Sequence, residues 1–193
     1  MKLKKINKGF IEEYCKKYAE KDSKESNSDK AIVKLVKLLP KNNNLSDIQL
    51  KVSVINDLYG TNIFYTPAMA EHILSLDVDK EIEKGSPEIV EKIAKIRINK
   101  KKKAKKMYSF ATKYCSWHNQ AKYPIFDSKV ERLLKKYNKQ DKFSEQNMQN
   151  LKDYTVFKKV VEDFIEHNKL RGINFKKIDM ALWEYARELF PYK

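Results

Sequence analysis

Apolar residues recur at spacings of three and four positions along most of the chain, the period of an α-helix with one buried face. No segment of four to eight residues keeps the two-residue alternation of a half-buried strand, and there is no Asn-Gly or Asp-Gly hairpin signal. We therefore expect an all-α protein. Two stripes, which we expect to pack in the core, consist of Leu151, Tyr154, Phe157, Val160, Val161, Phe164 and Ile165, and of Phe175, Ile178, Ala181, Leu182, Tyr185, Leu189 and Phe190.

Capping signals place several helix starts. Residues 46–49 have the form of a capping box beginning at Ser46, while Thr66-Pro67 and Ser86-Pro87 each set a hydroxyl before a first-turn proline. Polar sequence predicts loops over 20–30 and 138–147. The pattern predicts one α-helical domain over 1–193, which we expect to be monomeric, with helices over 8–20, 29–39, 46–58, 66–75, 86–97, 104–118, 127–137, 151–168 and 174–190.

Composition narrows the class of protein. The apolar runs are far shorter than the roughly 20 residues that span a bilayer, and no apolar segment of a secretory signal follows the first five residues. We expect no membrane association and a cytoplasmic location, at the nucleoid if the protein is bacterial.

Cys15 and Cys115 are a hundred positions apart and lack the further Cys and His neighbours of a metal site. We expect neither a metal nor a cofactor.

A net charge of +15 favours a polyanionic partner, and double-stranded DNA is the one that we expect. The competing explanation is codon bias, because lysine and asparagine are abundant while arginine occurs only four times. The lysines are densest just before an aromatic helix that begins near Tyr108, where they can neutralise phosphates. The residues that we expect to bind the DNA backbone are Lys100, Lys101, Lys102, Lys103, Lys105, Lys106 and Lys129.

After that aromatic helix the chain reads Tyr123-Pro124-Ile125-Phe126-Asp127-Ser128-Lys129-Val130. Pro124 ends one element, and Asp127 stands where the N-cap of the next helix is expected. On local chemistry alone, helix capping is a sufficient role for this aspartate. The resemblance of the segment to a known family adds a second role.

The segment resembles the core of the helix-hairpin-helix DNA glycosylase superfamily. In that family a proline and two apolar residues precede the catalytic Asp, and an Ala of the upstream helix stands 16 positions before it, as Ala111 does before Asp127. The likeness is specific over 105–130 and extends over about 50–135. It implies a two-lobed helical bundle and a base-excision repair enzyme that hydrolyses the N-glycosidic bond of a damaged base, with an 8-oxoguanine-type purine as the first candidate.

The chain departs from the family pattern at two places. The glycines of the family hairpin, whose amides hold a phosphate, are replaced by Lys105-Lys106-Met107. We expect lysine ammonium groups to grip the backbone in their place. The family's Gln-Gln pair, which fills the gap left by a flipped base, is also missing, and Tyr59 or Asn62 is the candidate wedge.

The resemblance assigns Asp127 the task of stabilising positive charge on the deoxyribose. Strand-nicking members carry a nucleophilic lysine 18 positions before this Asp, where Ser109 stands here, so base removal without nicking is favoured. Lys106 and Lys113 lie one helical turn on either side of Ser109, and Lys113 is the leading candidate for a displaced Schiff-base lysine. Its simpler role is a phosphate contact.

A flipped base needs an aromatic or apolar slot. Trp117, Tyr114, Phe64 and Trp183 are the large rings available, and core packing is the simpler role for each of them. Two other functions remain open: a glycosylase-like DNA-binding protein that has lost catalysis, with phage defence as its candidate role, and a protein-interaction domain. Loss of the hairpin glycines, the glutamines and the lysine favours the first of these two.

Overall fold

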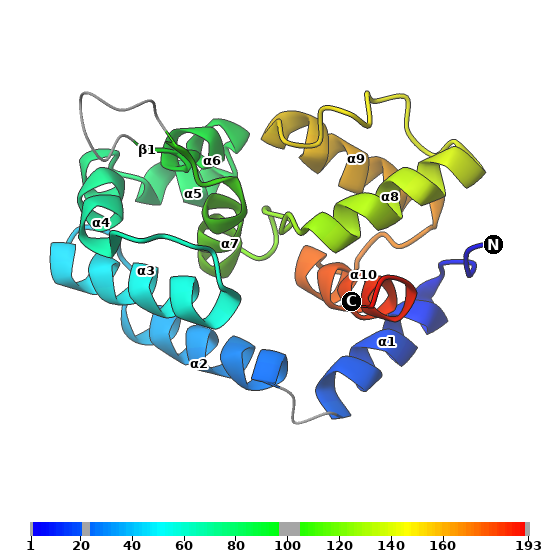
Figure 1. Ribbon diagram of the computed structural model, residues 1–193, viewed down its shortest axis with the longest axis horizontal. Helices are drawn as coiled ribbons and strands as arrows, with labels where there is room; N and C mark the ends of the chain where they lie inside the picture. Colours follow the sequence, from blue (N-terminus) through cyan, green and yellow to red (C-terminus); the bar gives the residue numbers. More distant parts are fainter. Residues whose placement is uncertain (1, 21–23, 97–104, 192–193) are drawn as a thin grey trace. The chain divides into compact units, whose positions relative to one another are not determined.

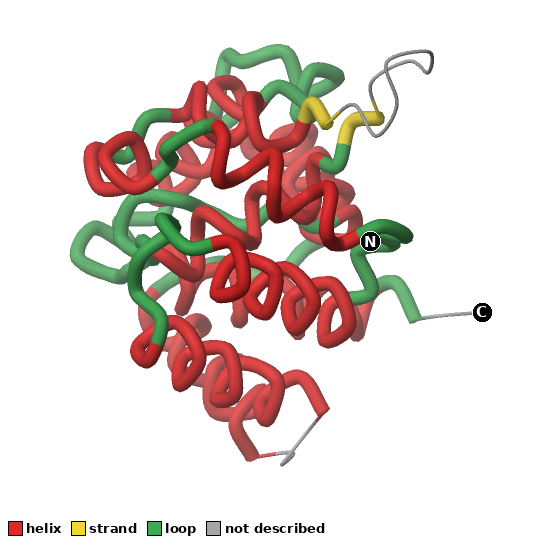
Figure 2. Tube along the Cα trace, turned by 90° about the vertical axis from the view of Figure 1, so that its left-hand side faces the viewer, coloured by secondary structure: helices red, strands yellow, loops and turns green. Residues whose placement is uncertain are grey.

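The computed structural model describes residues 2–20, 24–96 and 105–191, with backbone only for Lys24 and Lys105. The predicted all-α class is confirmed, since the described residues form ten helices and one short strand pair (Figures 1 and 2). The elements are α1 (Lys8–Glu20), α2 (Lys24–Leu38), α3 (Leu45–Tyr59), α4 (Thr66–Ser75), α5 (Asp79–Lys84), α6 (Pro87–Ala94), β1 (Lys95–Ile96), β2 (Lys105–Lys106), α7 (Tyr108–His118), α8 (Ser128–Asp141), α9 (Tyr154–His167) and α10 (Phe175–Leu189).

The chain divides into two compact units. The terminal unit joins residues 1–23 to residues 124–193 and contains α1, α8, α9 and α10. The central unit is residues 24–123 and contains α2 to α7 with the strand pair. The chain passes from the central unit to the terminal unit at Pro124, three residues before Asp127.

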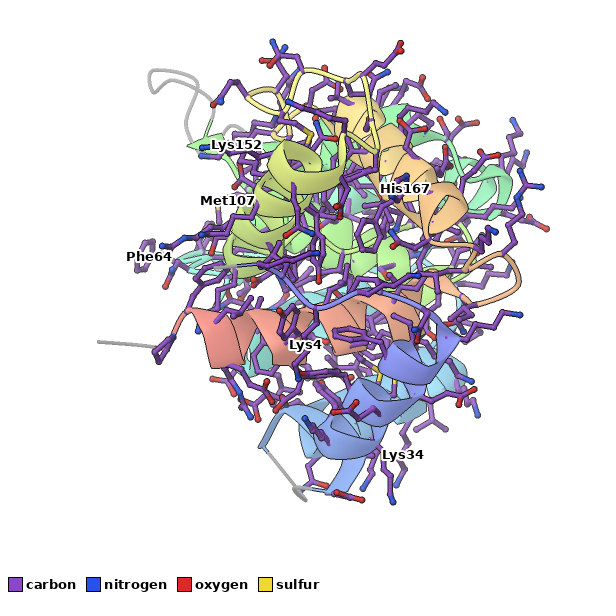
Figure 3. The ribbon with its side chains drawn as sticks, turned by 90° about the vertical axis from the view of Figure 1, so that its right-hand side faces the viewer. Lys4, Lys34, Phe64, Met107, Lys152 and His167 are labelled. Atoms are coloured by element: carbon purple, nitrogen blue, oxygen red, sulfur yellow. The ribbon has the colours of Figure 1, made fainter. Side chains whose placement is uncertain are left out.

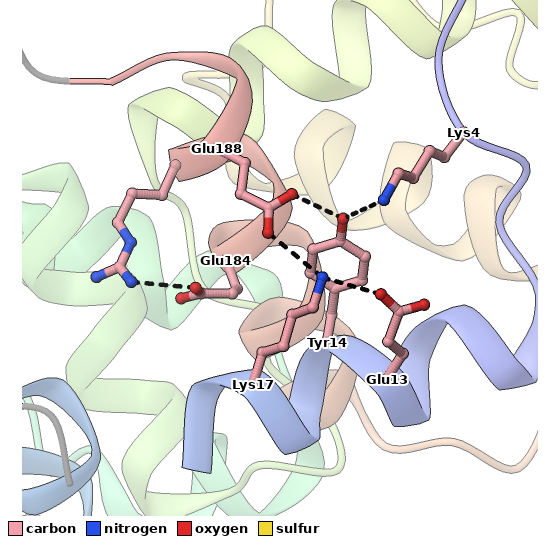
Figure 4. A network of polar contacts seen from close by, with 7 residues as sticks. Lys4, Glu13, Tyr14, Lys17, Glu184 and Glu188 are labelled. Atoms are coloured by element: carbon pink, nitrogen blue, oxygen red, sulfur yellow. Dashed lines mark hydrogen bonds and ion pairs between the residues drawn. The ribbon is translucent and has the colours of Figure 1, made fainter. Parts of the chain in front are cut away.

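In the terminal unit α1 packs against α10 (Figure 1). Aromatic rings of the two helices meet between them. Phe10 stacks on Tyr14 at 4.3 Å between centroids and meets the edge of Tyr185 at 5.3 Å. The Tyr14 hydroxyl donates to Glu188 at 2.8 Å and accepts from the Lys4 ammonium at 2.8 Å (Figure 4). Because Lys4 precedes α1 and Glu188 closes α10, these bonds fix the N-terminal segment against α10.

In the central unit α3 packs against α2, α4 and α7, and α6 packs against α7. Apolar residues at the centre of this packing are fully buried, as Val52, Ile55, Met69 and Ile93 illustrate. Burying a side chain of this size contributes about 1.5–3 kcal/mol. Tertiary packing of these residues therefore holds helices that are too short to be stable alone.

A strand pair connects α6 to α7. Lys95 pairs with Lys106 and Ile96 with Lys105 in an antiparallel register, and Met107 N donates to Ala94 O at 2.8 Å. The predicted helix start at residue 104 is therefore wrong, because Lys105 and Lys106 belong to β2 and α7 begins at Tyr108.

Other predicted boundaries also need correction. The loop predicted over 20–30 is wrong from Lys24 onward, because α2 begins there with a polar first turn that hides the helical pattern. The loop predicted from 138 is wrong at its start, because α8 continues to Asp141. Helix α5 was not predicted, since six residues are too few to show a periodic stripe.

The predicted N-cap positions are wrong for α3 and α4 and confirmed for α6. Asn44 caps α3, its Oδ1 accepting from Ser46 N at 2.9 Å and Asp47 N at 3.2 Å. Thr66 is already the first residue of α4, whose N-cap is Tyr65. Ser86 is the N-cap residue of α6, as predicted, but its hydroxyl donates to Glu88 at 2.6 Å and forms no capping bond. Asparagine competes well with serine at this position because its oxygen reaches the same two amides.

Candidate functional site

Asp127 is the N-cap of α8, as the sequence predicts. Its Oδ1 accepts from Lys129 N at 2.8 Å and from Val130 N at 3.4 Å, and its backbone is extended. The side chain is half-buried. The free amides and the dipole of the first helical turn stabilise the ionised carboxylate. The Asp127 carboxylate is thus fixed by two backbone amides and still has access to solvent.

The segment before Asp127 is firmly supported. Pro124, Ile125 and Phe126 are buried, Tyr154 donates from its hydroxyl to Pro124 O at 3.0 Å, and Phe126 meets the edge of Phe157 at 5.4 Å. Both partners come from α9, one of the predicted core stripes. The carboxylate is therefore presented from a packed segment, which is what a catalytic or binding group needs.

Four of the predicted site residues meet in the central unit. Lys113 is only 5% exposed, and its Nζ donates to Ser109 Oγ at 2.7 Å. The same Nζ lies 5.3 Å from the centroid of the Tyr59 ring, which is 6.4 Å from the Trp117 ring. We call these four residues the α7 cluster, since three of them lie on one face of α7 at intervals of four.

Within the α7 cluster Tyr59 is fixed at both ends. Its hydroxyl donates to Asp29 Oδ1 at 2.7 Å, and the Lys113 ammonium lies over its ring. A cation that is screened from water interacts with an aromatic face by about 2 kcal/mol. The Ser109 side chain, half-buried, accepts from Lys113 and can donate its own hydrogen to a ligand.

The remaining predicted residues lie elsewhere or outside the described residues. Asn62 is exposed in the loop between α3 and α4 with φ 59°. Lys106 is exposed and forms an ion pair with Glu91 at 3.0 Å, with its Nζ 4.8 Å from the Tyr108 ring. Lys129 is half-buried beside Asp127. Lys100, Lys101, Lys102 and Lys103 lie outside the described residues, and Lys105 is described only as backbone of β2.

A buried polar network in the central unit has no counterpart in the sequence analysis. Lys51 is fully buried, and its Nζ donates to Leu39 O at 3.1 Å, Lys41 O at 2.6 Å and Asn42 Oδ1 at 2.6 Å. Asn42 Oδ1 also accepts from the Tyr114 hydroxyl at 2.5 Å. We call Lys51, Asn42, Tyr114, His118 and Asp79 the Lys51 network, Asp79 accepting from Asn42 at 2.6 and 3.0 Å.

Burial controls the charges of this network. It lowers the pKa of Lys51 to about 8 against the opposing pull of Asp79 and Asp47, so the ammonium form persists at pH 7. Burial, helped by the Lys51 charge, lowers the pKa of His118 to about 4. A neutral His118 can donate from Nδ1 to Tyr114 O at 3.0 Å and accept from Lys51 Nζ, which is 3.4 Å from Nε2. This network ties the loop before α3 to α7.

Neither a metal group nor a membrane span is found where the structure is described. No group of three or more His, Cys, Asp or Glu side chains in these residues could hold a metal ion. Cys115 is buried, which raises the pKa of its thiol, and Cys15 donates to Lys177 O at 3.2 Å. Among the same residues, no helix has the length and apolar character that crossing a bilayer requires.

The fold and these groups define an all-α protein with a helix-capping carboxylate in one unit and a buried lysine cluster in the other. The chain belongs to the family described as HI_0787_N, an N-terminal domain, whose model matches residues 10–122. A Haemophilus influenzae protein described as uncharacterized is 42% identical over 141 residues, which are 72% of this chain. The match covers 66% of that relative, slightly less than two thirds of its length. No solved structure matches the chain.

The family match has a consequence for the site. The matched region ends at residue 122, before the segment that supports Asp127. Ser109, Lys113 and Trp117 all lie within the matched region. The α7 cluster and the Lys51 network therefore belong to the part that defines the family, and Asp127 lies five residues beyond it.

Proposed function

We propose that the protein is a DNA glycosylase that hydrolyses the N-glycosidic bond of a damaged or modified base in double-stranded DNA, with an 8-oxoguanine-type purine as the first candidate. The observation that carries the proposal is Asp127. It combines the residue pattern of the glycosylase core with a half-exposed carboxylate at a helix N-terminus.

Hydrolysis of an N-glycosidic bond requires a carboxylate in a fixed position. As the glycosidic bond breaks, positive charge develops on the deoxyribose, and a fixed carboxylate stabilises that charge. The same carboxylate can take a proton from the attacking water. Because amides of α8 hold Asp127 in place, little reorganisation is needed during the reaction.

The α7 cluster supports hydrolysis without strand nicking. A Schiff base requires the lysine nitrogen to attack the sugar, but Lys113 Nζ is buried and already donates to Ser109. Its position supports a different role, in which Lys113 orients the Ser109 hydroxyl toward a bound nucleotide. Lys113 would then be a positioning residue, and Ser109 a binding residue.

The basic character of the chain supports DNA as the substrate. Lys95 and Lys106 are exposed on the strand pair, where cations can neutralise phosphates. Such contacts provide affinity without reading sequence, and recognition of the lesion then depends on the flipped base.

The proposal is tested with duplexes that each contain 8-oxoguanine, uracil, hypoxanthine, an alkylated purine or a mismatch. The purified full chain is incubated with each duplex, and hot alkali then cleaves any abasic site. Alkali-dependent breaks on one lesion duplex, without breaks before alkali, are the expected result. Borohydride trapping of a protein–DNA adduct that Lys113→Gln abolishes would contradict hydrolysis without nicking.

The alternative function, a DNA-binding protein that has lost catalysis, predicts a different outcome of the same assay. It would leave every duplex intact while binding them with an affinity that falls steeply as salt rises. That result, obtained with a correctly folded chain, would contradict the glycosylase proposal.

A further inference from the structure

The loop between α3 and α4 presents two aromatic side chains to solvent. Phe64 is 86% exposed and Tyr65 is 53% exposed. The expectation that Phe64 packs in a core is therefore wrong. Figure 3 shows Phe64 at the margin of the molecule, on the same side as Met107. A phenylalanine with this exposure presents a large apolar surface to solvent.

The loop is held in shape by its own hydrogen bonds. We call residues 60–65 the Phe64 loop. Asn56 Oδ1 accepts from Thr61 Oγ1 at 2.9 Å and from Ile63 N at 2.8 Å, while Asn56 Nδ2 donates to Ile63 O at 3.2 Å. Ile63 itself is buried. Phe64 therefore follows a residue that is anchored on both its amide and its carbonyl.

The surroundings of the Phe64 loop are basic. A small hollow of about 20 Å³ is lined by the loop together with Met69, Ile96 and Met107, so the loop adjoins the strand pair. Lys95 and Lys106 of that pair are exposed. An aromatic ring beside cations suits a nucleic acid, which offers flat bases and phosphates.

We propose that Phe64, flanked by Tyr65, stacks on an unstacked base of bound DNA while cations of the strand pair hold the neighbouring phosphates. This inference rests on the proposed function because it takes DNA as the ligand. It assigns the contact with the unstacked base to Phe64, which lies outside the α7 cluster. Stacking of one base on an aromatic side chain changes affinity by about 5- to 100-fold. Neither an ammonium group nor an aliphatic side chain at position 64 can stack on a base in this way, so the change in affinity is specific to a flat ring.

The test compares binding to two duplexes that differ by one unpaired nucleotide. Fluorescence anisotropy measures the affinity of the full chain for a labelled paired duplex and for the same duplex with a single-nucleotide bulge. Phe64→Ala should weaken binding to the bulged duplex by about 5- to 100-fold and binding to the paired duplex by much less. Phe64→Trp, which keeps a flat ring, should restore the preference.

The matched control is Leu38→Ala. Leu38 is also highly exposed, at 68%, and lies between the exposed lysines Lys37 and Lys41, but it has no ring. This variant should bind both duplexes as the unmodified chain does. Circular dichroism checks that each variant keeps its helical content.

Each failure has its own meaning. If Phe64→Ala binds the bulged duplex as Leu38→Ala does, or loses affinity equally for both duplexes, the stacking role is wrong while the glycosylase proposal stands. If the unmodified chain binds neither duplex at low salt, both proposals fail. A Phe64 side chain that contacts a protein partner instead of DNA would give the first of these results.

Discussion

The Lys51 network predicts a specific loss of stability in mild acid. Burial and the Lys51 charge lower the pKa of His118 from its ordinary value of 6.5 to about 4. The folded pKa is thus below that of the unfolded chain, which takes up the proton first as the pH falls. The stabilising contribution of neutral His118 is complete above pH 6.5 and is lost as the pH falls from 6.5 to 4.

The magnitude follows from the difference between the two pKa values. A shift of one unit corresponds to about 1.4 kcal/mol, so the loss is about 2 kcal/mol at pH 5 and about 3 kcal/mol below pH 4. The charged groups that face His118 are Lys51, which disfavours its protonation, and Asp79, which favours it. Protonation also removes the acceptor that Nε2 offers to Lys51.

The perturbation that isolates this effect is His118→Asn. The amide can still donate to Tyr114 O, as Nδ1 does, but it does not titrate. The chain has two tryptophans, and Trp117 is the one in the central unit, so a Trp183→Phe background lets fluorescence follow that unit alone.

Urea unfolding of this background, with and without His118→Asn, is measured from pH 7 to pH 4. The parent should lose about 2 kcal/mol more than the variant between pH 7 and pH 5. Carboxylates that titrate in acid act equally on both proteins and cancel in the comparison. Parallel curves for the two proteins would refute the assignment of His118 as a buried neutral histidine.

Three further predictions concern single side chains. Lys51→Met removes the donor to two backbone carbonyls and to Asn42, and should lower the free energy of unfolding by about 2–5 kcal/mol. The exposed Lys37→Met should change it by less than about 0.5 kcal/mol, and similar values for the two variants in urea titrations would contradict the network. Asn56→Ala should expose the Phe64 loop to limited proteolysis, while the exposed Asn43→Ala should not; equal cleavage rates would show that Asn56 does not hold the loop. Asp127→Ala should destabilise the chain by about 1 kcal/mol and Asp127→Asn by only a few tenths, as thermal unfolding can measure, and an Asn variant as unstable as the Ala variant would contradict the capping geometry.

Local chemistry was enough to predict part of the molecule. The all-α class followed from the spacing of apolar residues, and Asp127 was predicted as a cap because a proline, two apolar residues and an amphipathic segment surround it. The bounds of α1 and α4 match their predicted ranges. These features depend on neighbours within one or two helical turns.

Features set by tertiary contacts were not predictable in the same way. Nothing in the sequence distinguishes Lys51 from the many other lysines. Its burial is explained by the backbone carbonyls of Leu39 and Lys41, which the fold brings to its ammonium group. Phe64 was expected in a core because it is large and apolar, but Asn56 holds the loop so that its ring stays outside. The α7 cluster was predictable only in part. The spacing of its α7 residues on one helix face can be read from the sequence, but the contact of Lys113 with the Tyr59 ring cannot.

The most direct test of the glycosylase proposal is a single-turnover assay that compares Asp127→Asn with the unmodified chain on the lesion duplex that the panel selects. Asparagine keeps the hydrogen bonds to Lys129 N and Val130 N but removes the charge. If Asp127 has this catalytic role, Asp127→Asn should unfold at nearly the same temperature, still bind the duplex, and release the base at least about 100-fold more slowly, the usual scale for losing a charge-stabilising group. Base release at the unmodified rate by Asp127→Asn would contradict it.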